Sequence, residues 1–263
     1  NARLASARRL TSRKDRRETG RFLAEGAQAV REALRAGIVV ELFATAEAMA
    51  RNHDLLLGVE VAQISAKDAA ALSETSTPQG LVAVCRQVDV PLATALSRAP
   101  RLVAALVEPG DPGNLGTIVR TSDAAGAGAV VALGGVDVYN GKAVRASAGS
   151  LCHLDVVRLG ADDTLGAVLP AARAAGLRVL ATSAEGEHDL DDLDDLRDPG
   201  ADSVLRLPTL WLFGNEAHGL PADVLAAADL SVRVPIHGRA ESLNVAAAAA
   251  VCLYASARAQ RLP

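Results

Sequence analysis

The segment from Leu210 to Ala250 constrains the fold most, because two short apolar runs in it each end in a loop that contains glycine. Leu210 to Phe213 leads into the turn GNEAHG, and Leu230 to Val234 leads into the turn PIHGR. Glycine lets the backbone adopt φ > 0 and approach a ligand closely. In an open α/β sheet, ligands bind at the edge where strands end in such loops. The segment therefore predicts two strands whose following loops form a binding site.

The composition is that of a globular chain. Of the 263 residues, 50% are hydrophobic but only 2% are aromatic, so Ala, Val and Leu must build the core. No apolar run reaches the roughly 18 residues that a membrane helix needs. The three cysteines lie far apart without a CxxC pair, which argues against a disulfide framework or a zinc site and favours a reducing, cytoplasmic compartment. The length suits one large or two small domains.

The charge of the chain is distributed unevenly. Residues 1–21 contain eight Lys or Arg and two acidic residues, a net charge of +6, whereas the whole chain carries −4. A basic arm on an acidic body is typical of a nucleic-acid handle, because phosphate contacts supply most non-specific affinity. A solvated N-terminal helix or a disordered tail would carry the same charges. The charge pattern alone leaves these interpretations open.

Residues 22–86 alternate in the manner of a small α/β domain. Apolar side chains at helical spacing predict a helix within residues 22–36, ended by Gly37. Ser65 is expected to cap a helix that reaches about Leu72. Strands are expected over residues 39–43, 59–64 and 81–85. Residues 87–100 contain two prolines and few large apolar groups, which predicts a linker.

A second and larger α/β unit is expected over residues 101–263. Its expected strands cover residues 102–107, 129–133, 154–157, 179–181, 210–213 and 230–234, and its expected helices cover residues 115–125, 143–147, 164–175 and 242–259. The stretch from Glu185 to Asp202 carries nine carboxylates, which predicts a solvated loop. A metal site is the alternative there, but no His or Asp spacing in the stretch defines a metal geometry. We expect no metal.

Five polar residues of the larger unit could carry chemistry. Asn114 and Arg120 lie six residues apart, about 1.7 turns, so both can flank the opening between a strand and the next helix. Free N–H groups and the helix dipole at such an opening favour an anion by ~0.3–1 kcal/mol. Each residue also has an ordinary interpretation: Arg120 as a surface ion pair, Glu216 as a turn carboxylate, and Ser242 with Asn244 as a helix start.

Several common enzyme signatures are missing from the sequence. It has no GxGxxG after a strand, no GxxxxGK[ST] and no GxSxG. These absences argue against a dinucleotide fingerprint, a P-loop and an α/β-hydrolase elbow.

Three ordered stretches, PGNLGTIVRTSDAAGA, FGNEAHGLP and VPIHGRAESLNVAAAAAVCLY, resemble the three motifs of the SpoU/TrmH family of RNA 2′-O-ribose methyltransferases in the SPOUT superfamily. YNGKAVRASAGS resembles the segment that lies between the first two of them in this family. FLAEGAQAVREAL and TSTPQGLVAV resemble the family's N-terminal substrate-binding domain. The resemblance thus spans nearly the whole chain.

The resemblance implies a fold class and a division of the chain. It implies an α/β protein whose C-terminal domain, residues 101–263, is a trefoil-knotted methyltransferase domain, an exception to the rule that chains do not thread loops. Residues 22–86 would form a smaller RNA-binding α/β domain, with the basic arm 1–21 before it and the linker 87–100 after it. It also implies a homodimer that forms through the knotted domain.

The resemblance also implies a reaction and its residues. The reaction is transfer of a methyl group from S-adenosylmethionine to a ribose 2′-hydroxyl of structured rRNA or tRNA. The implied catalytic set is Arg120, Asn114, Glu216, Ser242 and Asn244. An arginine is effectively never deprotonated, so we expect Arg120 to hold the adjacent phosphate and stabilise the developing alkoxide, or to act as a base only in a desolvated site.

The remaining implied residues concern the cofactor and the RNA. The implied cofactor set is Leu212, Gly214, Val234, Ile236 and Leu243, acting largely through backbone groups around the adenosyl moiety. The charge pattern and the resemblance together suggest RNA contacts by Arg8, Arg9, Arg13, Lys14 and Arg145. The alternatives are an RNA-binding protein of the same fold that has lost catalysis, and a nucleotide- or small-molecule-binding α/β enzyme with an unrelated site.

Overall fold

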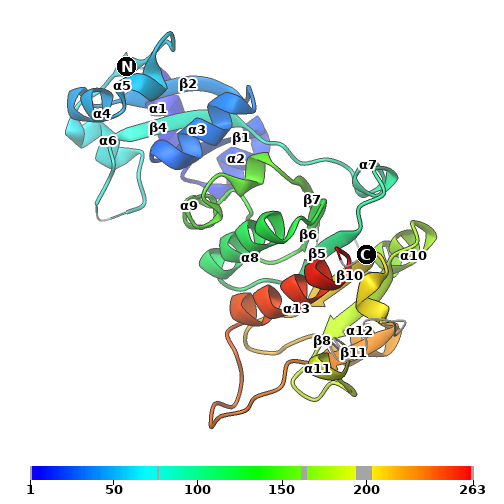
Figure 1. Cartoon of the computed structure of the whole chain (residues 1–263). Coiled ribbons are helices and arrows are strands. Elements are labelled where there is room, and N and C mark those ends of the chain that lie inside the picture. Colours follow the sequence, from blue (N-terminus) through cyan, green and yellow to red (C-terminus); the bar gives the residue numbers. More distant parts are fainter. Residues whose placement is uncertain (1, 76, 161–164, 194–202, 262–263) are drawn as a thin grey trace. The chain divides into compact units, whose positions relative to one another are not determined.

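The computed structural model describes residues 2–75, 77–160, 165–193 and 203–261. Its contacts divide the chain into two compact units (Figure 1). The first comprises residues 1–88 and 137–153, and the second comprises residues 89–136 and 154–263. This division differs from the predicted one, because residues 137–153 leave the larger unit and pack with the smaller one. Each unit is described by itself below.

The first unit is a four-stranded mixed sheet with helices around it. Its strands are β1 (Arg21–Glu25), β2 (Val39–Ala44), β3 (Ala62–Gln63) and β4 (Leu81–Arg86), in the spatial order β1-β4-β2-β3. Only the β2–β3 pair is parallel. Its helices are α1 (Ala2–Arg9), α2 (Arg13–Thr19), α3 (Ala27–Arg35), α4 (Ala46–Arg51), α5 (His53–Leu56), α6 (Ala66–Ala71) and α9 (Gly141–Ser147), followed by the 3-10 turn η1 (Ser150–Cys152).

The basic N-terminal residues form part of this folded unit. Ala7 of α1 and Leu10 are 3% and 4% exposed, and they pack in one core cluster with Leu23 and Val84. The apolar side chains thus tie α1 to the sheet, while most of its basic side chains stay exposed. The segment is therefore helical rather than a disordered tail, and its use as a nucleic-acid handle stays a prediction.

Two predicted elements of the first unit are wrong in part. The segment 22–36 is a strand followed by a helix, because Gly26 has φ 91° and breaks the chain between β1 and α3. The apolar run FLA is short enough to suit either element, and its pairing with β4 decided the outcome. The expected strand 59–64 contains only the two residues of β3. The strands β2 and β4 and the Ser65-capped α6 are confirmed.

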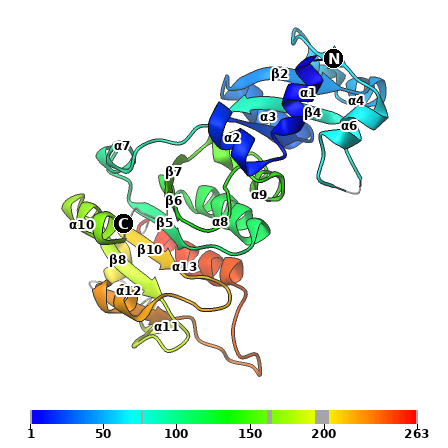
Figure 2. The same cartoon turned by 180° about the vertical axis from the view of Figure 1, so that it is seen from behind.

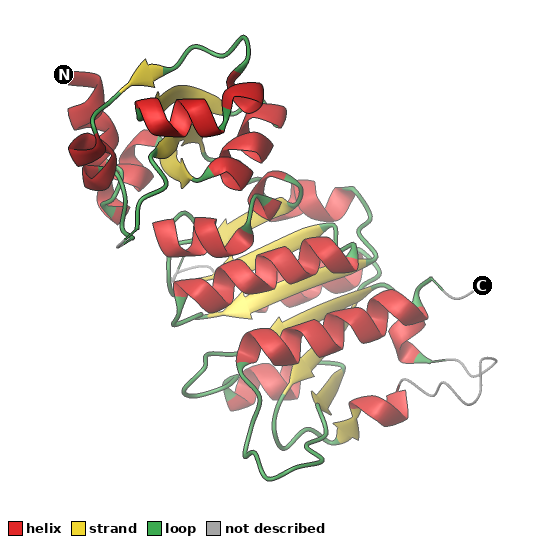
Figure 3. Ribbon diagram, turned by 60° about the vertical axis from the view of Figure 1, so that its left-hand side comes forward, coloured by secondary structure: helices red, strands yellow, loops and turns green. Residues whose placement is uncertain are grey.

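The second unit is a seven-stranded, fully parallel sheet in the order β7-β6-β5-β10-β8-β11-β9 (Figure 3). Its strands are β5 (Leu102–Val107), β6 (Ala129–Leu133), β7 (Asp155–Leu159), β8 (Arg178–Thr182), β9 (His188–Asp189), β10 (Thr209–Phe213) and β11 (Leu230–Arg233). Its helices are α7 (Leu92–Ser97), α8 (Pro112–Ala125), α10 (Leu165–Ala174), α11 (Leu190–Leu193), α12 (Ala222–Ala227) and α13 (Val245–Ala259), with a 3-10 turn η2 (Val204–Arg206).

Alternating side chains give this sheet two buried faces. Val103 and Leu210 face a core cluster that α7, α10 and α12 complete. Trp211, the next residue along β10, faces the other side, where its Nε1 donates to Ser256 Oγ of α13 at 2.9 Å. Helices α8 and α13 lie side by side in this unit (Figures 1 and 3). Parallel strands buried on both faces explain the nearly continuous apolar runs.

The predicted strands of this unit are confirmed to within a few residues, whereas three local predictions are wrong. Residues 92–97 of the expected linker form α7. The acidic stretch begins with a turn as predicted, but its residues 188–193 form β9 and α11, and its residues 194–202 lie outside the described part. The last helix begins at Val245 with Asn244 as its cap, rather than at Ser242.

Candidate active site

A cleft of about 650 Å³ lies in the second unit, at the carboxyl ends of its central strands. Four segments line it: the start of α8, the loops after β8 and β10, and the segment from β11 into α13. Its lining residues are Asn114, Thr182, Ser183, Ala184, Glu185, Gly214, Asn215, Glu216, His218, Gly219, Leu220, Val232, Val234, Ile236, Glu241, Ser242, Leu243, Asn244, Val245 and Ala248. The loops predicted from the sequence therefore meet at one cleft.

Glu216 ties the β10 loop to the start of α8. Its Oε2 accepts from the amide of Gly110 at 2.8 Å, and its Oε1 accepts from the amide of Asp111 at 3.2 Å. Oε1 also accepts from Nδ2 of Asn114 at 2.9 Å. Burial opposes the charge of Glu216, but the hydrogen bonds from Asn114 and the backbone amides outweigh it, so the pKa of Glu216 lies below its ordinary value. The carboxylate is therefore ionised at neutral pH.

The start of α8 is shaped for this contact by its sequence. Asp111 caps the helix by accepting from the amide of Asn114 at 2.9 Å, and Pro112 occupies the first turn, where no N–H is required. Gly126 ends the helix with φ 82°. The capped N-terminus places the Asn114 side chain at the mouth of the cleft.

Asn244 joins α13 to the same network. Its Oδ1 caps α13 by accepting from the amide of Ala246 at 2.9 Å, and its Nδ2 donates to Oδ1 of Asn114 at 3.1 Å. Asn114 thus uses its donor on Glu216 and its acceptor on Asn244, which defines its amide orientation. Three separate stretches of sequence are linked by this chain of side chains.

The turn after β10 depends on glycine and asparagine. Position 214 accommodates only glycine, because a Cβ there would lie 2.3 Å from the carbonyl carbon of Gly219. The backbones of Asn215 and Gly219 exchange hydrogen bonds of 3.1 and 2.8 Å, and Nδ2 of Asn215 donates to the carbonyl of Glu108 at 2.7 Å. Asn215 was not among the residues predicted for the site, although it stands beside Glu216 in GNEAHG.

Most of the predicted cofactor set lines the cleft. Gly214, Val234, Ile236 and Leu243 all do, and the side chains of Ile236 and Leu243 are 37% and 40% exposed. Leu212 is fully buried in β10 and is not among the lining residues; its carbonyl accepts from Oγ1 of Thr182, which does line the cleft, at 2.9 Å. Two exposed apolar side chains in a cleft of this kind suit an adenosyl group.

Arg120 stands apart from the other four predicted catalytic residues. Asn114, Glu216, Ser242 and Asn244 line the cleft, whereas Arg120 is an exposed residue of α8 and is not among the described lining residues. Its guanidinium has no hydrogen bond or ion pair with the part of the chain that the structure describes. An exposed cation without a partner is available to a phosphate.

A fourth segment of the cleft, Thr182 to Glu185, was not among the predicted site residues. It directly follows β8, which was predicted as a strand, so the end of that strand was the available signal. Glu185 and Glu241 add two carboxylates to the cleft beside Glu216. A cleft with three carboxylates suits a positively charged ligand.

The predicted RNA contacts lie in the first unit. Arg8, Arg9, Arg13 and Lys14 are exposed on α1 and α2. Arg9 pairs with Asp15, with Nη2 and Oδ1 2.5 Å apart, and Nζ of Lys14 lies 3.8 Å from Oε1 of Glu18. These pairs are solvent-exposed and therefore weak.

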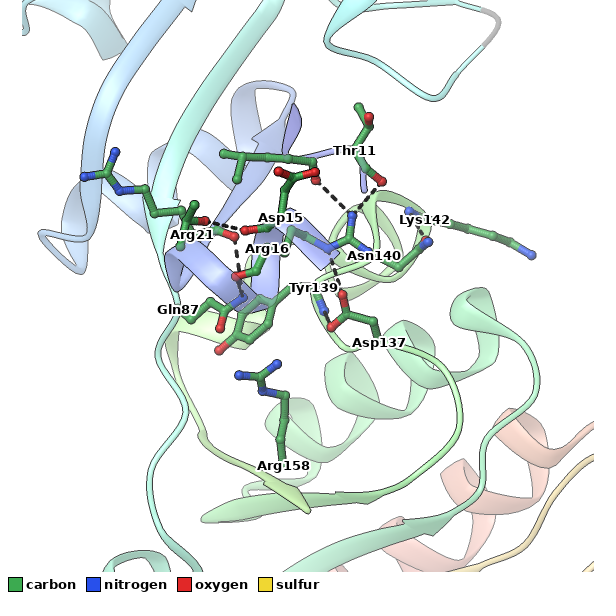
Figure 4. A network of polar contacts seen from close by, with 12 residues as sticks. Thr11, Asp15, Arg16, Arg21, Gln87, Asp137, Tyr139, Asn140, Lys142 and Arg158 are labelled. Carbon is green, nitrogen blue, oxygen red and sulfur yellow. Dashed lines mark hydrogen bonds and ion pairs between the residues drawn. The ribbon is translucent and has the colours of Figure 1, made fainter. Parts of the chain in front are cut away.

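Arg145 contacts Glu25, and the start of its segment is held by the polar network around Arg16 that Figure 4 shows. Nη1 of Arg145 lies 3.4 Å from Oε2 of Glu25. The buried Arg16 donates through Nε to Oδ2 of Asp137 at 2.7 Å, and through Nη1 to the carbonyls of Leu10 and Thr11, each at 2.9 Å. This buried ion pair fastens the start of the segment 137–153 to the N-terminal helices.

Two further observations on the described residues concern a metal site and a membrane-spanning helix. Within the described residues, no group of His, Cys, Asp or Glu side chains is arranged to hold a metal ion. None of the described helices is long and apolar enough to cross a membrane.

Comparison with known proteins identifies both parts of the chain. Residues 101–254 match the model of the SpoU rRNA Methylase family, and residues 1–83 match that of the MRM3-like substrate binding domain. The chain is 37% identical to the 23S rRNA (guanosine(2553)-2′-O)-methyltransferase RlmP of Bacillus subtilis over 97% of this chain and 95% of that protein. It is 39% identical to the 23S rRNA (uridine(2479)-2′-O)-methyltransferase of Streptomyces viridochromogenes over 57% of this chain and 50% of that protein.

Solved structures of methyltransferases have the same fold as this chain. The SpoU methyltransferase AviRb of Streptomyces viridochromogenes, in complex with AdoMet, has a TM-score of 0.83 and 32% identity, covering 98% of each chain. The AdoMet-bound rRNA methyltransferase of Sinorhizobium meliloti has a TM-score of 0.80 and 31% identity, over 98% of this chain and 95% of that one. This α/β chain, with its parallel sheet and its N-terminal substrate-binding domain, belongs to the SpoU rRNA methylase family.

Proposed function

We propose that this chain transfers the methyl group of S-adenosylmethionine to a ribose 2′-hydroxyl of large-subunit ribosomal RNA. The observation that carries the proposal is the Glu216–Asn114–Asn244 chain of hydrogen bonds, which joins the three resemblance motifs at one cleft. The relatives named for 23S rRNA support the choice of ribosomal RNA over tRNA.

The residues of the cleft fit S-adenosylmethionine. The cofactor supplies an electrophilic methyl group on a positively charged sulfonium. Glu185, Glu216 and Glu241 suit its positive charge, and the exposed Ile236 and Leu243 suit an adenine ring. A volume of about 650 Å³ is within the range of small-molecule sites.

The roles of the catalytic set follow from their geometry. Glu216, Asn114 and Asn244 spend their polar groups on one another and on the backbone, so we assign them to holding the cleft in shape. Ser242 is exposed in the cleft and can contact the substrate ribose. Because an arginine side chain in a protein is effectively never deprotonated, we assign Arg120 to the phosphate beside the target ribose and to the developing negative charge on the 2′-oxygen.

The RNA is held, in this proposal, by the basic residues of the first unit. Arg8, Arg9, Arg13 and Lys14 present cations on α1 and α2 without deep burial. Arg145 is half-buried and its contact with Glu25 is long, so a phosphate can compete for it. We place the reaction in the cytoplasm, where ribosomal RNA and free thiols such as those of this chain occur together.

The trefoil knot and the homodimer are also proposals. The support for a threaded C-terminal segment is the match to the SpoU family together with the position of β10, which is inserted between the earlier strands β5 and β8. Val251 and Tyr254 on α13 are 44% and 52% exposed, at helical spacing on one face. Such an apolar stripe supports association with a second copy, which sedimentation or light scattering would test.

The test of the function is methyl transfer to isolated RNA. The purified chain and labelled S-adenosylmethionine are incubated with unmodified 23S rRNA or with tRNA, and modified riboses are located by their resistance to alkaline cleavage. We expect one ribose of the 23S rRNA to be labelled, and Arg120→Ala to abolish labelling while calorimetry shows unchanged cofactor binding. Cofactor binding without any labelling of RNA would favour the catalytically silent alternative.

A further inference from the structure

The first unit contains two surface grooves of similar size. One lies between α1 and α6, has a volume of about 490 Å³ and is lined by Leu4, Ala5, Arg8, Arg9, Thr11, Asp68, Ala71 and Leu72. The other lies beside α3 and α5, has a volume of about 520 Å³ and is lined by Arg31, Leu34, Arg35, Asp54, Leu55 and Val59. Each combines an apolar floor with two arginines and one aspartate.

The arginines distinguish the two grooves. In the α3–α5 groove, Nη1 of Arg31 donates to Oε1 of Gln28 at 2.7 Å, and Nη1 of Arg35 donates to Oε1 of Glu32 at 3.0 Å. In the α1–α6 groove, Arg9 pairs with Asp15, but the guanidinium of Arg8 has no hydrogen bond or ion pair with any described residue. Only the α1–α6 groove therefore offers a cation that is not already engaged within the described structure.

The charges around the α1–α6 groove are mostly positive, and its one carboxylate already accepts a hydrogen bond. It lies on the segment 1–21, which carries a net charge of +6. Its one carboxylate, Asp68, is engaged with Oγ of Ser65 at 2.7 Å in the cap of α6, and it retains acceptor capacity. Figure 2 shows α1 and α6 on the same part of the unit.

We propose that the α1–α6 groove binds one unpaired nucleotide of the RNA substrate, with the base on the apolar floor of Leu4, Ala5 and Leu72 and its phosphate on Arg8. Asp68 would accept a hydrogen bond from an exocyclic amino group or a ribose hydroxyl. Single-stranded RNA exposes base faces and edges that a duplex hides, so such a groove recognises an unstacked nucleotide. The proposal rests on the proposed function in that it requires RNA as the substrate.

The first test fills the groove without changing its charge. Ala5 is exposed at the groove, so Ala5→Trp occupies the space of the base, and Leu34→Trp does the same in the α3–α5 groove as a control. Fluorescence anisotropy measures binding of a labelled oligouridylate and of a paired RNA duplex of equal length. We expect Ala5→Trp to weaken the single strand about tenfold, the order of one lost base contact, and to leave the duplex unchanged.

The second test removes the cation. Arg8→Gln is expected to reduce the slope of log K against log salt for the oligouridylate by about 0.7, the value for one single-strand phosphate contact. The matched control is Arg31→Gln in the α3–α5 groove, which is expected to leave the slope unchanged. Arg8→Gln changes only an exposed side chain, so it tests the groove even if Ala5→Trp disturbs folding.

Three outcomes would overturn the proposal: an Ala5→Trp protein that folds and binds the oligouridylate like the unmodified chain, equal losses in both grooves, or an unmodified chain that does not bind the oligouridylate. Failure of the proposed function looks different, because RNA would bind while no ribose of 23S rRNA became methylated. In the methylation assay, Ala5→Trp is expected to raise KM for RNA with kcat unchanged.

Discussion

Nδ2 of Asn244 donates to Oδ1 of Asn114 at 3.1 Å, across 130 residues of sequence. Because Asn244 also caps α13, the contact joins the first turns of two helices that pack side by side. Glu216 completes the link from the opposite loop. The shape of the cleft is therefore set by a few hydrogen bonds between segments that have no local reason to meet.

Asn114→Asp should disable the site with little effect on the rest of the fold. The new carboxylate would take the place of a donor 2.9 Å from Oε1 of Glu216, and two carboxylates at that distance repel. We expect kcat/KM for methyl transfer to fall by about 100-fold, the order expected when groups near the reaction shift by about 1 Å. Thr121→Ala is the control. It lies about two turns further along the same helix, and the variant should keep full activity.

Glu216→Gln should change the pH dependence of stability. The pKa of Glu216 is lowered by hydrogen bonds that outweigh burial, so its contribution to stability is present above the ordinary carboxyl pKa and is lost as pH falls through the lowered value. We therefore expect the variant to be less stable at neutral pH and to approach the unmodified chain only as pH falls below the ordinary carboxyl pKa and through the lowered pKa of Glu216. Urea unfolding at several pH values measures the gap; a gap that widened in acid would contradict the assignment.

Gly214→Ala should disrupt the β10 loop. A Cβ there would lie 2.3 Å from the carbonyl carbon of Gly219, which is backbone and cannot rotate away. We expect a loss of about 1–3 kcal/mol in unfolding free energy and weaker binding of S-adenosylmethionine by calorimetry. Gly238→Ala has open space around its Cβ and no positive φ, so it should leave the unfolding free energy unchanged.

Arg16→Met should destabilise the first unit. Arg16 and Asp137 have side chains only 3% and 5% exposed, and the substitution removes the guanidinium that faces this buried carboxylate. Breaking such a pair from one side costs about 3–5 kcal/mol. Chemical denaturation should show this loss, whereas Arg17→Met, at an exposed neighbouring position, should have an effect within about 0.5 kcal/mol. A loss as small as that of the control would show that the pair is not a fastening of the segment 137–153.

The strands of the larger unit could be predicted because they are buried on both faces and bounded by turn residues. The strand 129–133 was predicted to the residue, and Gly126 marked the end of α8 before it. The predictions failed where short segments suit two structures. The run FLA of β1 suits a helix or a strand. Ser242 and Asn244 both suit a helix cap, and the choice of Asn244 depends on Asn114, whose Oδ1 accepts from Nδ2 of Asn244.

The features of the site are likewise of two kinds, those that local sequence predicts and those that depend on long-range contacts. Glycines, caps and strand ends are local properties, so the class of fold, the two loops of the cleft and the motifs of the family could be predicted from the order of the residues alone. The meeting of Glu216, Asn114 and Asn244, the contribution of Thr182 to Glu185, and the packing of residues 137–153 with the first unit were decided only by the tertiary structure. The physical reason is that these contacts join residues far apart in the chain, and their free energy exists only once the strands are paired and the helices packed.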